Sequence, residues 1–137
     1  MQVQCLNRKV WVAATPEEIV RQGWLTQLEL QGFPRALIAV EKELSQLTHL
    51  NCKKVPTRRA DILCFAPVTL QPLVLIECKA VPLTQKAVTQ ALAYNHFVQA
   101  RFVAIVNQTE IKFGYPTSEG YKFVSFLPHF EDLKAKD

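Results

Sequence analysis

The feature that most constrains the fold is an apolar run, Leu73 to Ile76, followed at once by Glu77, Cys78 and Lys79. An uninterrupted apolar run of this kind predicts a strand that is buried on both faces. A carboxylate and an ammonium at the end of such a strand are costly unless the charges are paired. The end of this strand therefore needs a partner for its charges, either a bound ion or another side chain.

Helix and strand patterns on both sides of this run predict an α/β domain in the order α-β-β-β-α-β. At the start of the first helix, Thr15 can act as the N-cap, Pro16 fits the first helical position and Glu18 completes a capping box. Gly32 is a suitable residue just after its C-terminal end. The polar, basic segment 44–59 is expected to extend a strand and form a loop. The expected segments are a helix over 15–32, strands over 36–41, 60–65 and 73–79, a helix over 84–100, a strand over 101–107, short strands over 110–115 and 121–126, and a helical turn after 128.

The connections between these segments predict how the strands pair. The strand–helix–strand passage from 73 to 107 implies a parallel pair with a right-handed crossover. The first three strands are joined by short links and are expected to be antiparallel. The predicted architecture is a mixed sheet flanked by helices, and the length of 137 residues predicts one domain over 1–137.

Composition narrows the classes of function. A formal net charge of +4 and a pI near 9.0 permit a polyanionic partner without requiring one. No two of the four cysteines have C-x-x-C spacing, so we expect no zinc site and reduced thiols in a cytoplasmic protein. A G-x-x-x-x-G-K-[ST] loop is missing, so we expect no nucleotide cofactor. No apolar run approaches the ~20 residues that cross a membrane, so no membrane partner is expected.

Two carboxylates are predicted to converge near the end of the central strand. Alternate residues of a strand share a face, so Glu77 and Lys79 are expected on one face and Cys78 on the other. Asp61 opens the preceding strand and is the one aspartate outside the C-terminal tail. Two converging carboxylates repel each other, and a Mg²⁺ ion relieves that repulsion because it accepts a few oxygen ligands and keeps several waters. A nearby lysine can then hold or deprotonate an attacking water.

The alternative is a salt bridge at the end of the strand, in which Asp61 pairs with Arg58 or Arg59. A second E-x-K sequence, Glu110-Ile111-Lys112, has no aspartate on a neighbouring upstream strand. It is interpreted as an exposed edge pattern of alternating charge.

The segments "TPEEIVRQ", "GFPRALIAVEKEL", "RADILCF", "PLVLIECKA", "QALAYN", "FVAIVN" and "FLPHF" together resemble the N-terminal nuclease domain of type I restriction enzyme R subunits. That domain belongs to the PD-(D/E)-x-K nuclease superfamily, with a restriction-endonuclease-like core. The resemblance implies that Asp61 and Glu77 bind Mg²⁺, with Mn²⁺ a plausible substitute, and that Lys79 assists the water. Ala60 stands where the first motif often has proline, a position that varies in the superfamily.

The resemblance also implies a Q-x-x-x-Y element, as in RecB-like nucleases, here Gln90 and Tyr94. Residues four apart lie on one helix face, and this face is expected to look toward the metal; the alternative is a merely polar face with a packed tyrosine. Glu18 or Glu17 would add a further carboxylate, although the capping box already explains Glu18.

A basic set is expected to bind the DNA backbone, the alternative being a solvated loop. It comprises Lys53, Lys54, Arg58 and Arg59.

The expected function is that of a Mg²⁺-dependent deoxyribonuclease that hydrolyses phosphodiester bonds in double-stranded DNA. A separate motor or specificity subunit is a possible partner, because type I R subunits carry a motor beyond this domain. Two alternatives stay open: a non-catalytic DNA-binding module that keeps the nuclease fold, and an interaction protein in which the acidic and basic residues form salt bridges.

Overall fold

The computed structural model describes residues 2–5, 11–13, 15–43 and 59–134. Its centre is a six-stranded mixed sheet in the order β3-β4-β5-β6-β7-β8. The β5–β6 pair is parallel and the other neighbouring pairs are antiparallel. The strands of this sheet are β3 (Ile38–Glu43), β4 (Arg59–Phe65), β5 (Pro72–Cys78), β6 (Phe102–Val106), β7 (Ile111–Thr117) and β8 (Gly120–Val124).

In the described part of the chain, three α-helices accompany the sheet, and the order α1-β3-β4-β5-α2-β6 is the predicted one. The expected α/β class, the parallel β5–β6 pair and the antiparallel β3–β4–β5 segment are confirmed. The remaining elements are α1 (Pro16–Leu30), α2 (Gln85–Val98), α3 (Phe130–Lys134), a short 3-10 helix η1 (Arg35–Leu37), and a separate two-stranded sheet of β1 (Gln2–Gln4) and β2 (Trp11–Ala13).

Helix α1 begins and ends where its capping residues predict. The Glu18 N–H donates to Thr15 Oγ1 at 3.1 Å, and Pro16 occupies the first helical position. At the other end, Gly32 adopts a φ of 84°, which a side chain would make costly. The Gly32 N–H donates to Glu29 O and the Phe33 N–H to Leu28 O, the pattern of a Schellman cap.

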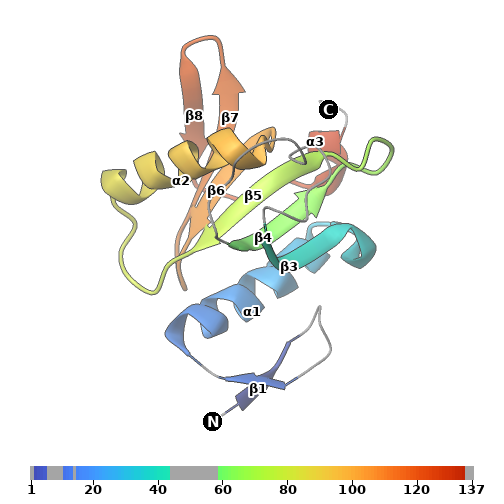
Figure 1. Cartoon of the computed structure of the whole chain (residues 1–137), viewed down its shortest axis with the longest axis vertical. Coiled ribbons are helices and arrows are strands. Elements are labelled where there is room, and N and C mark those ends of the chain that lie inside the picture. Colours follow the sequence, from blue (N-terminus) through green and yellow to red (C-terminus); the bar gives the residue numbers. More distant parts are fainter. Residues whose placement is uncertain (1, 6–10, 14, 44–58, 135–137) are drawn as a thin grey trace.

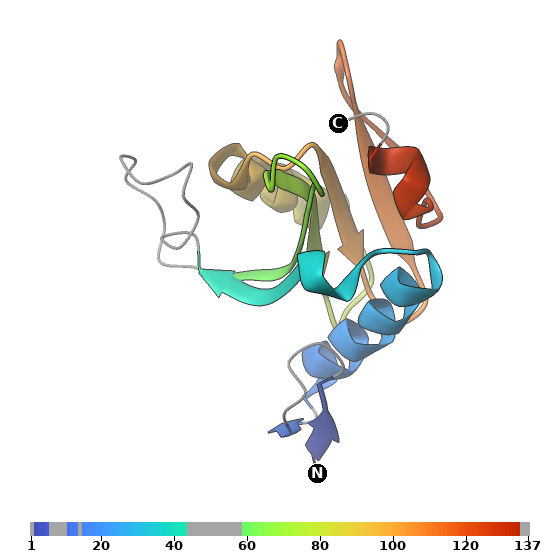
Figure 2. The ribbon, with the colours of Figure 1, turned by 90° about the vertical axis from the view of Figure 1, so that its right-hand side faces the viewer.

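Helices α1 and α2 cover opposite faces of the sheet (Figures 1 and 2). One core cluster joins Val20, Leu25 and Leu28 of α1 to Ile62, Ile76 and Ala104 of the sheet, and also includes Phe130 and Leu133 of α3. On the other face, side chains of α2 pack against β4, β5 and β6. The central strand β5 is buried along its whole length, as its apolar run predicts.

Several predicted boundaries differ from the structure. The first strand of the sheet starts at Ile38 because η1 occupies 35–37, and α2 is shorter than the expected 84–100. β7 lies between β6 and β8, but its pairing with β8 begins at Phe113. Residues 110–112 therefore lie beyond the paired end of β8, with Glu110 exposed and Lys112 partly exposed, as the expected edge pattern implies. The segment 44–58 lies outside the described residues. Among the described helices, none combines the length and the apolar character needed to span a membrane.

Candidate active site

The candidate site forms where β4 and β5 separate. Their paired register runs from the turn to Ile62 opposite Ile76 and stops there. Just beyond it, the Cys78 N–H donates to Asp61 Oδ2 at 2.8 Å, and the Asp61 N–H lies 3.4 Å from Glu77 Oε2. Each carboxylate therefore accepts a hydrogen bond from the backbone of the other strand. These two bonds continue the connection between the strands after the regular ladder ends.

Asp61 and Glu77 differ in their exposure to solvent. The Glu77 residue is 1% exposed, whereas the Asp61 side chain is 23% exposed. A buried carboxylate is costly unless it is paired or hydrogen-bonded. The structure thus brings together the two acids that the sequence singled out, one deep and one at the surface.

Arg21 of α1 is the cation closest to Asp61 among the described residues. Its Nη2 lies 3.1 Å from Asp61 Oδ1, and its Nη1 lies 2.6 Å from Glu18 Oε1 and 3.6 Å from Glu41 Oε1. The Arg21 side chain is 6% exposed. Asp61 therefore forms a salt bridge with Arg21. The expected pairing with Arg58 or Arg59 stays a prediction, because Arg58 and the side chain of Arg59 lie outside the described residues.

Neither Arg21 nor Glu41 was identified from the sequence. Arg21 lies three residues after Glu18, on the same face of α1, but its contact with Asp61 spans 40 positions. Glu41 belongs to β3 yet adopts a φ of 54°. This left-handed conformation is uncommon outside glycine and costs on the order of 1–3 kcal/mol. It interrupts β3 between the pairs Val40–Ile62 and Lys42–Ala60, within the strand that faces β4.

Charges around the site shift two pKa values. Burial alone lowers the pKa of the Arg21 guanidinium, but the charges of Glu18 and Asp61 outweigh it, so the pKa lies above its usual value. Burial and then the Asp61 charge raise the pKa of the Cys78 thiol well above its usual value of 9.0. At neutral pH, Arg21 is therefore a permanent cation, and Cys78 is a neutral thiol in the core on the α1 side.

Lys79 follows β5 directly. Its backbone N–H donates to Val106 O at 2.8 Å, which fixes the chain at the ends of β5 and β6, and its side chain is partly exposed. The second E-x-K sequence is placed differently. Glu110 is exposed before β7 and accepts from Asn107 Nδ2 at 3.3 Å, while Lys112 is opposite Ile105 of β6.

The two residues of the Q-x-x-x-Y element differ in burial. Gln90 is exposed on α2, whereas Tyr94 is 4% exposed and packs in a cluster with Ala60, Leu63 and Leu75. Tyr94 thus supports the start of β4, immediately before Asp61. The predicted orientation of its hydroxyl toward a phosphate stays a prediction.

The remaining predicted residues have other placements. Glu17 is exposed, while Glu18 is 6% exposed and also accepts from Gln22 Nε2 at 2.7 Å. In the basic set, Lys53, Lys54 and Arg58 lie outside the described residues. Arg59 begins β4, and nothing is described of its side chain.

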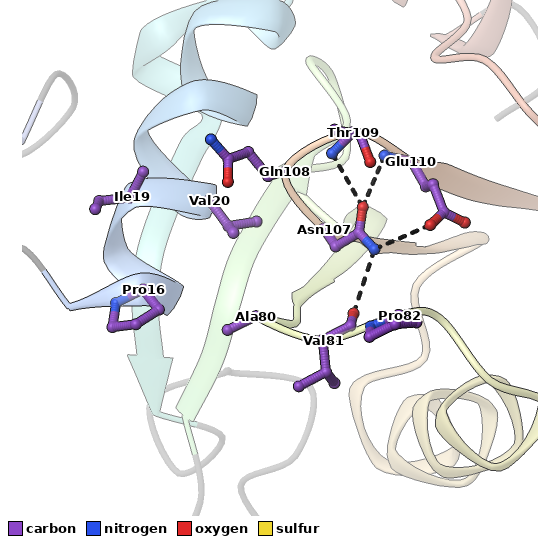
Figure 3. Close-up of a pocket in the computed structure, with 10 residues that line it drawn as sticks. All are labelled: Pro16, Ile19, Val20, Ala80, Val81, Pro82, Asn107, Gln108, Thr109 and Glu110. Atoms are coloured by element: carbon purple, nitrogen blue, oxygen red, sulfur yellow. Dashed lines mark hydrogen bonds between the residues drawn. The ribbon is translucent and has the colours of Figure 1, made fainter.

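A pocket of about 440 Å³ lies between the start of α1, the segment 80–82 and the β6–β7 turn (Figure 3). The segment 80–82 directly follows Lys79 in the sequence. Asn107 builds that turn: its Oδ1 accepts from the N–H groups of Thr109 and Glu110, and its Nδ2 donates to Val81 O. The charged side chain in the lining is the carboxylate of Glu110. A negative charge there makes the pocket unsuitable for a phosphate group.

The chemistry of Asp61 and Glu77 fits a hard divalent cation. Mg²⁺ is commonly bound through one or two carboxylates and retains several waters. Within the described ranges, no three histidine, cysteine, aspartate or glutamate side chains are grouped so that they form a metal site by themselves. A metal site here would therefore use these two carboxylates and depend on water or substrate oxygens for its other ligands.

Comparison with known proteins identifies the family of this chain. A family model described as the type I restriction enzyme R protein N terminus (HSDR_N) matches residues 16–128 of the 137-residue chain, from the start of α1 to just before α3. Neither a curated protein nor a solved structure matches the chain. The matched residues include Asp61, Glu77, Lys79, Gln90 and Tyr94. The chain therefore belongs to the family of type I restriction enzyme R protein N termini.

Proposed function

We propose that this domain hydrolyses phosphodiester bonds in double-stranded DNA with the help of Mg²⁺ or Mn²⁺. The observation that carries the proposal is a pair of hydrogen bonds at the point where β4 and β5 separate. The Asp61 N–H donates to Glu77 Oε2, and the Cys78 N–H, next to Lys79 in the chain, donates to Asp61 Oδ2. The family match supports a nuclease-like role.

In this proposal, Asp61 and Glu77 are the ligands of the divalent cation. Such a cation, when bound, supplies Lewis-acid stabilisation of charge on the phosphate and lowers the pKa of a water. The rigid strand end holds Glu77 in place, and the Cys78 N–H holds Asp61, so little reorganisation is needed when the substrate arrives. Both carboxylates also repel the phosphate, which makes the cation necessary for substrate binding.

Lys79 is proposed to handle the proton of the attacking water. It lies beyond the last residue of β5, two positions after Glu77, and its partly exposed side chain is accessible from solvent. As an ammonium, it would orient the water and stabilise developing negative charge; as a neutral amine, it would accept the proton. In-line attack at phosphorus then breaks the bond to the leaving oxygen.

DNA is proposed to be held by the basic set that precedes Asp61, through its phosphates. Lysine and arginine contacts to phosphate position the duplex without reading its sequence. A net charge of +4 is compatible with this role. A separate motor or specificity subunit is proposed as the partner that brings DNA to the domain.

A plasmid-nicking assay tests the proposal. The wild-type chain should nick supercoiled DNA with Mg²⁺ or Mn²⁺ and not with chelator, and Asp61→Asn should be inactive under the same conditions. Divalent metal should also raise the melting temperature of the wild type, because a ligand that binds only the folded state stabilises it. Absence of both effects would reject the nuclease proposal.

The second candidate is a non-catalytic module that keeps the fold and binds DNA or a protein partner. The salt bridge of Arg21 with Asp61 favours it, because a protein cation already neutralises the acid that a metal would need. In that case, metal leaves the melting temperature unchanged while DNA binding, measured by fluorescence anisotropy, persists in chelator.

A further inference from the structure

Arg21 sits among acids that it does not bind equally. Its shortest ion pair is with Glu18 on its own helix, at 2.6 Å; the pair with Asp61 is 3.1 Å and the pair with Glu41 is 3.6 Å. Glu18 is further held by Gln22. The ion pair with Glu18 therefore holds the guanidinium on α1, and the ion pairs with Asp61 of β4 and Glu41 of β3 are longer.

The guanidinium is also incompletely satisfied. Among the described residues, Arg21 Nε is buried without a hydrogen-bond partner. An arginine carries five N–H donors in a fixed fork, and leaving a buried donor unpaired costs stability. If the role of Arg21 were only to attach α1 to the sheet by ion pairs, we would expect all of its N–H donors to be paired.

Arg21 contacts Asp61 Oδ1, which is also the oxygen that a metal ion could bind. Asp61 Oδ2 is occupied by the Cys78 N–H, and Oδ1 faces Arg21 Nη2. A divalent ion at Asp61 would stand within a few ångströms of a permanent positive charge in a mostly buried site, where repulsion is stronger than in water. The arginine and the metal ion therefore cannot both hold Asp61 Oδ1 at low energetic cost.

We propose that Arg21 neutralises Asp61 in the metal-free site and competes with the divalent metal ion for this carboxylate. When the metal ion binds, Arg21 releases Asp61. This inference rests on the proposed metal site at Asp61 and Glu77. Glu18 keeps the displaced guanidinium on α1, so release from Asp61 does not strand a buried charge. The competition sets the affinity for the metal ion. Without metal, the carboxylate charge stays neutralised and the site is stable. With metal, the site binds the ion less tightly than the two carboxylates would bind it in the absence of Arg21.

The test is metal binding by Arg21→Gln and Arg21→Lys, measured by titration calorimetry with Mn²⁺ and by thermal melts with and without Mn²⁺. Arg21→Gln should melt below the wild type without metal, bind Mn²⁺ roughly ten times more tightly, the order expected for one charge-assisted hydrogen bond, and gain more in melting temperature from it. Arg21→Lys keeps a charge but loses the fork that spans two acids, so its affinity should lie between the two.

Arg35→Gln is the matched control. It removes an arginine whose 3.0 Å pair with Glu29 is exposed, and its Mn²⁺ affinity should equal that of the wild type. If Arg21→Gln does not fold, the order of affinities between Arg21→Lys and the wild type decides. Metal binding by the wild type that is not tightened in either Arg21 variant overturns the competition alone. Absence of metal binding in the wild type and in both variants rejects the metal site itself, and the competition with it.

Discussion

The backbone N–H of Cys78 donates a 2.8 Å hydrogen bond to Asp61 Oδ2 and so fixes the carboxylate of β4 against the end of β5. A charge-assisted bond of this kind is stronger than one between neutral groups. The position of Asp61 therefore does not depend on Arg21 alone. The backbone holds one carboxylate oxygen while the other is available to a cation, which is a suitable arrangement for a metal ligand at the surface of a rigid sheet.

Asp61→Asn and Asp61→Ala separate the charge of Asp61 from its hydrogen bond. Both variants should lose metal-dependent cleavage. Asn can still accept from the Cys78 N–H, whereas Ala leaves a buried donor unpaired, which costs about 1–3 kcal/mol. Urea denaturation in chelator should therefore rank stability as wild type, Asn, Ala. Relief of carboxylate repulsion alone would stabilise the metal-free protein, but the ion pair with Arg21 reverses that expectation. Cleavage by Asp61→Asn at the wild-type rate would remove Asp61 from the proposed site.

The two E-x-K sequences provide a matched pair of lysine variants. Lys79→Ala should reduce the nicking rate by about 10²–10⁴-fold, the usual contribution of a group that handles a proton. Lys112→Ala should nick at the wild-type rate, because Lys112 lies in β7 opposite Ile105, and the glutamate of its E-x-K sequence, Glu110, belongs to the β6–β7 turn. Equal losses in the two variants would show that the wrong E-x-K was assigned.

Local patterns in the sequence were sufficient to predict most of the fold. The apolar run of β5, the Thr15 and Pro16 signals and Gly32 are each recognisable from a few neighbouring residues, and each is found where it was expected. Pairing of β4 with β5 then followed from the short turn between them, which placed Asp61 near Glu77.

Contacts distant in sequence were not predictable in the same way. The Arg21–Asp61 pair depends on how α1 crosses the sheet, and no spacing rule connects two residues 40 positions apart. Glu41 reaches the site through a backbone conformation that its residue type disfavours. Consequently, Asp61 was predicted to bind a metal ion or to pair with Arg58 or Arg59, and its pairing with Arg21 was missed.

Stability should fall at alkaline pH, in part through Cys64. Complete burial in β4 raises the pKa of the Cys64 thiol far above its usual value of 9.0. The folded state thus keeps a proton that the unfolded state releases, so this contribution is present below about pH 8.5 and is lost as pH rises above it. Between pH 9 and 10, the free energy of unfolding of the wild type should fall more steeply than that of Cys64→Ala, by up to about 1.4 kcal/mol per pH unit. If the free energy of unfolding, measured by urea denaturation, falls equally with pH in the wild type and in Cys64→Ala, this prediction is contradicted.

The last prediction concerns Gln90 and Tyr94, which share a face of α2 but have different surroundings. Gln90 is exposed, so Gln90→Ala should leave the free energy of unfolding almost unchanged. Loss of one hydrogen bond to a charged group costs ~1.5–3 kcal/mol, so cleavage should fall roughly ten- to hundredfold, with Mn²⁺ affinity retained. Gln85→Ala, at an exposed glutamine of the first turn of α2, is the control and should cleave at the wild-type rate.

Tyr94 should respond mainly through packing. Its side chain lies in the cluster with Ala60 and Leu75, so Tyr94→Ala should cost about 3–5 kcal/mol, in the range of other large-to-small core changes. Tyr94→Phe keeps the ring, and it isolates the hydroxyl: we expect near-native stability and a smaller loss of cleavage than in Gln90→Ala, because the side chain is buried rather than open to DNA. Thermal melts, calorimetry and the nicking assay on the same preparations distinguish these effects. Wild-type cleavage by both Gln90→Ala and Tyr94→Phe would mean that this face of α2 supports the fold and takes no part in the reaction.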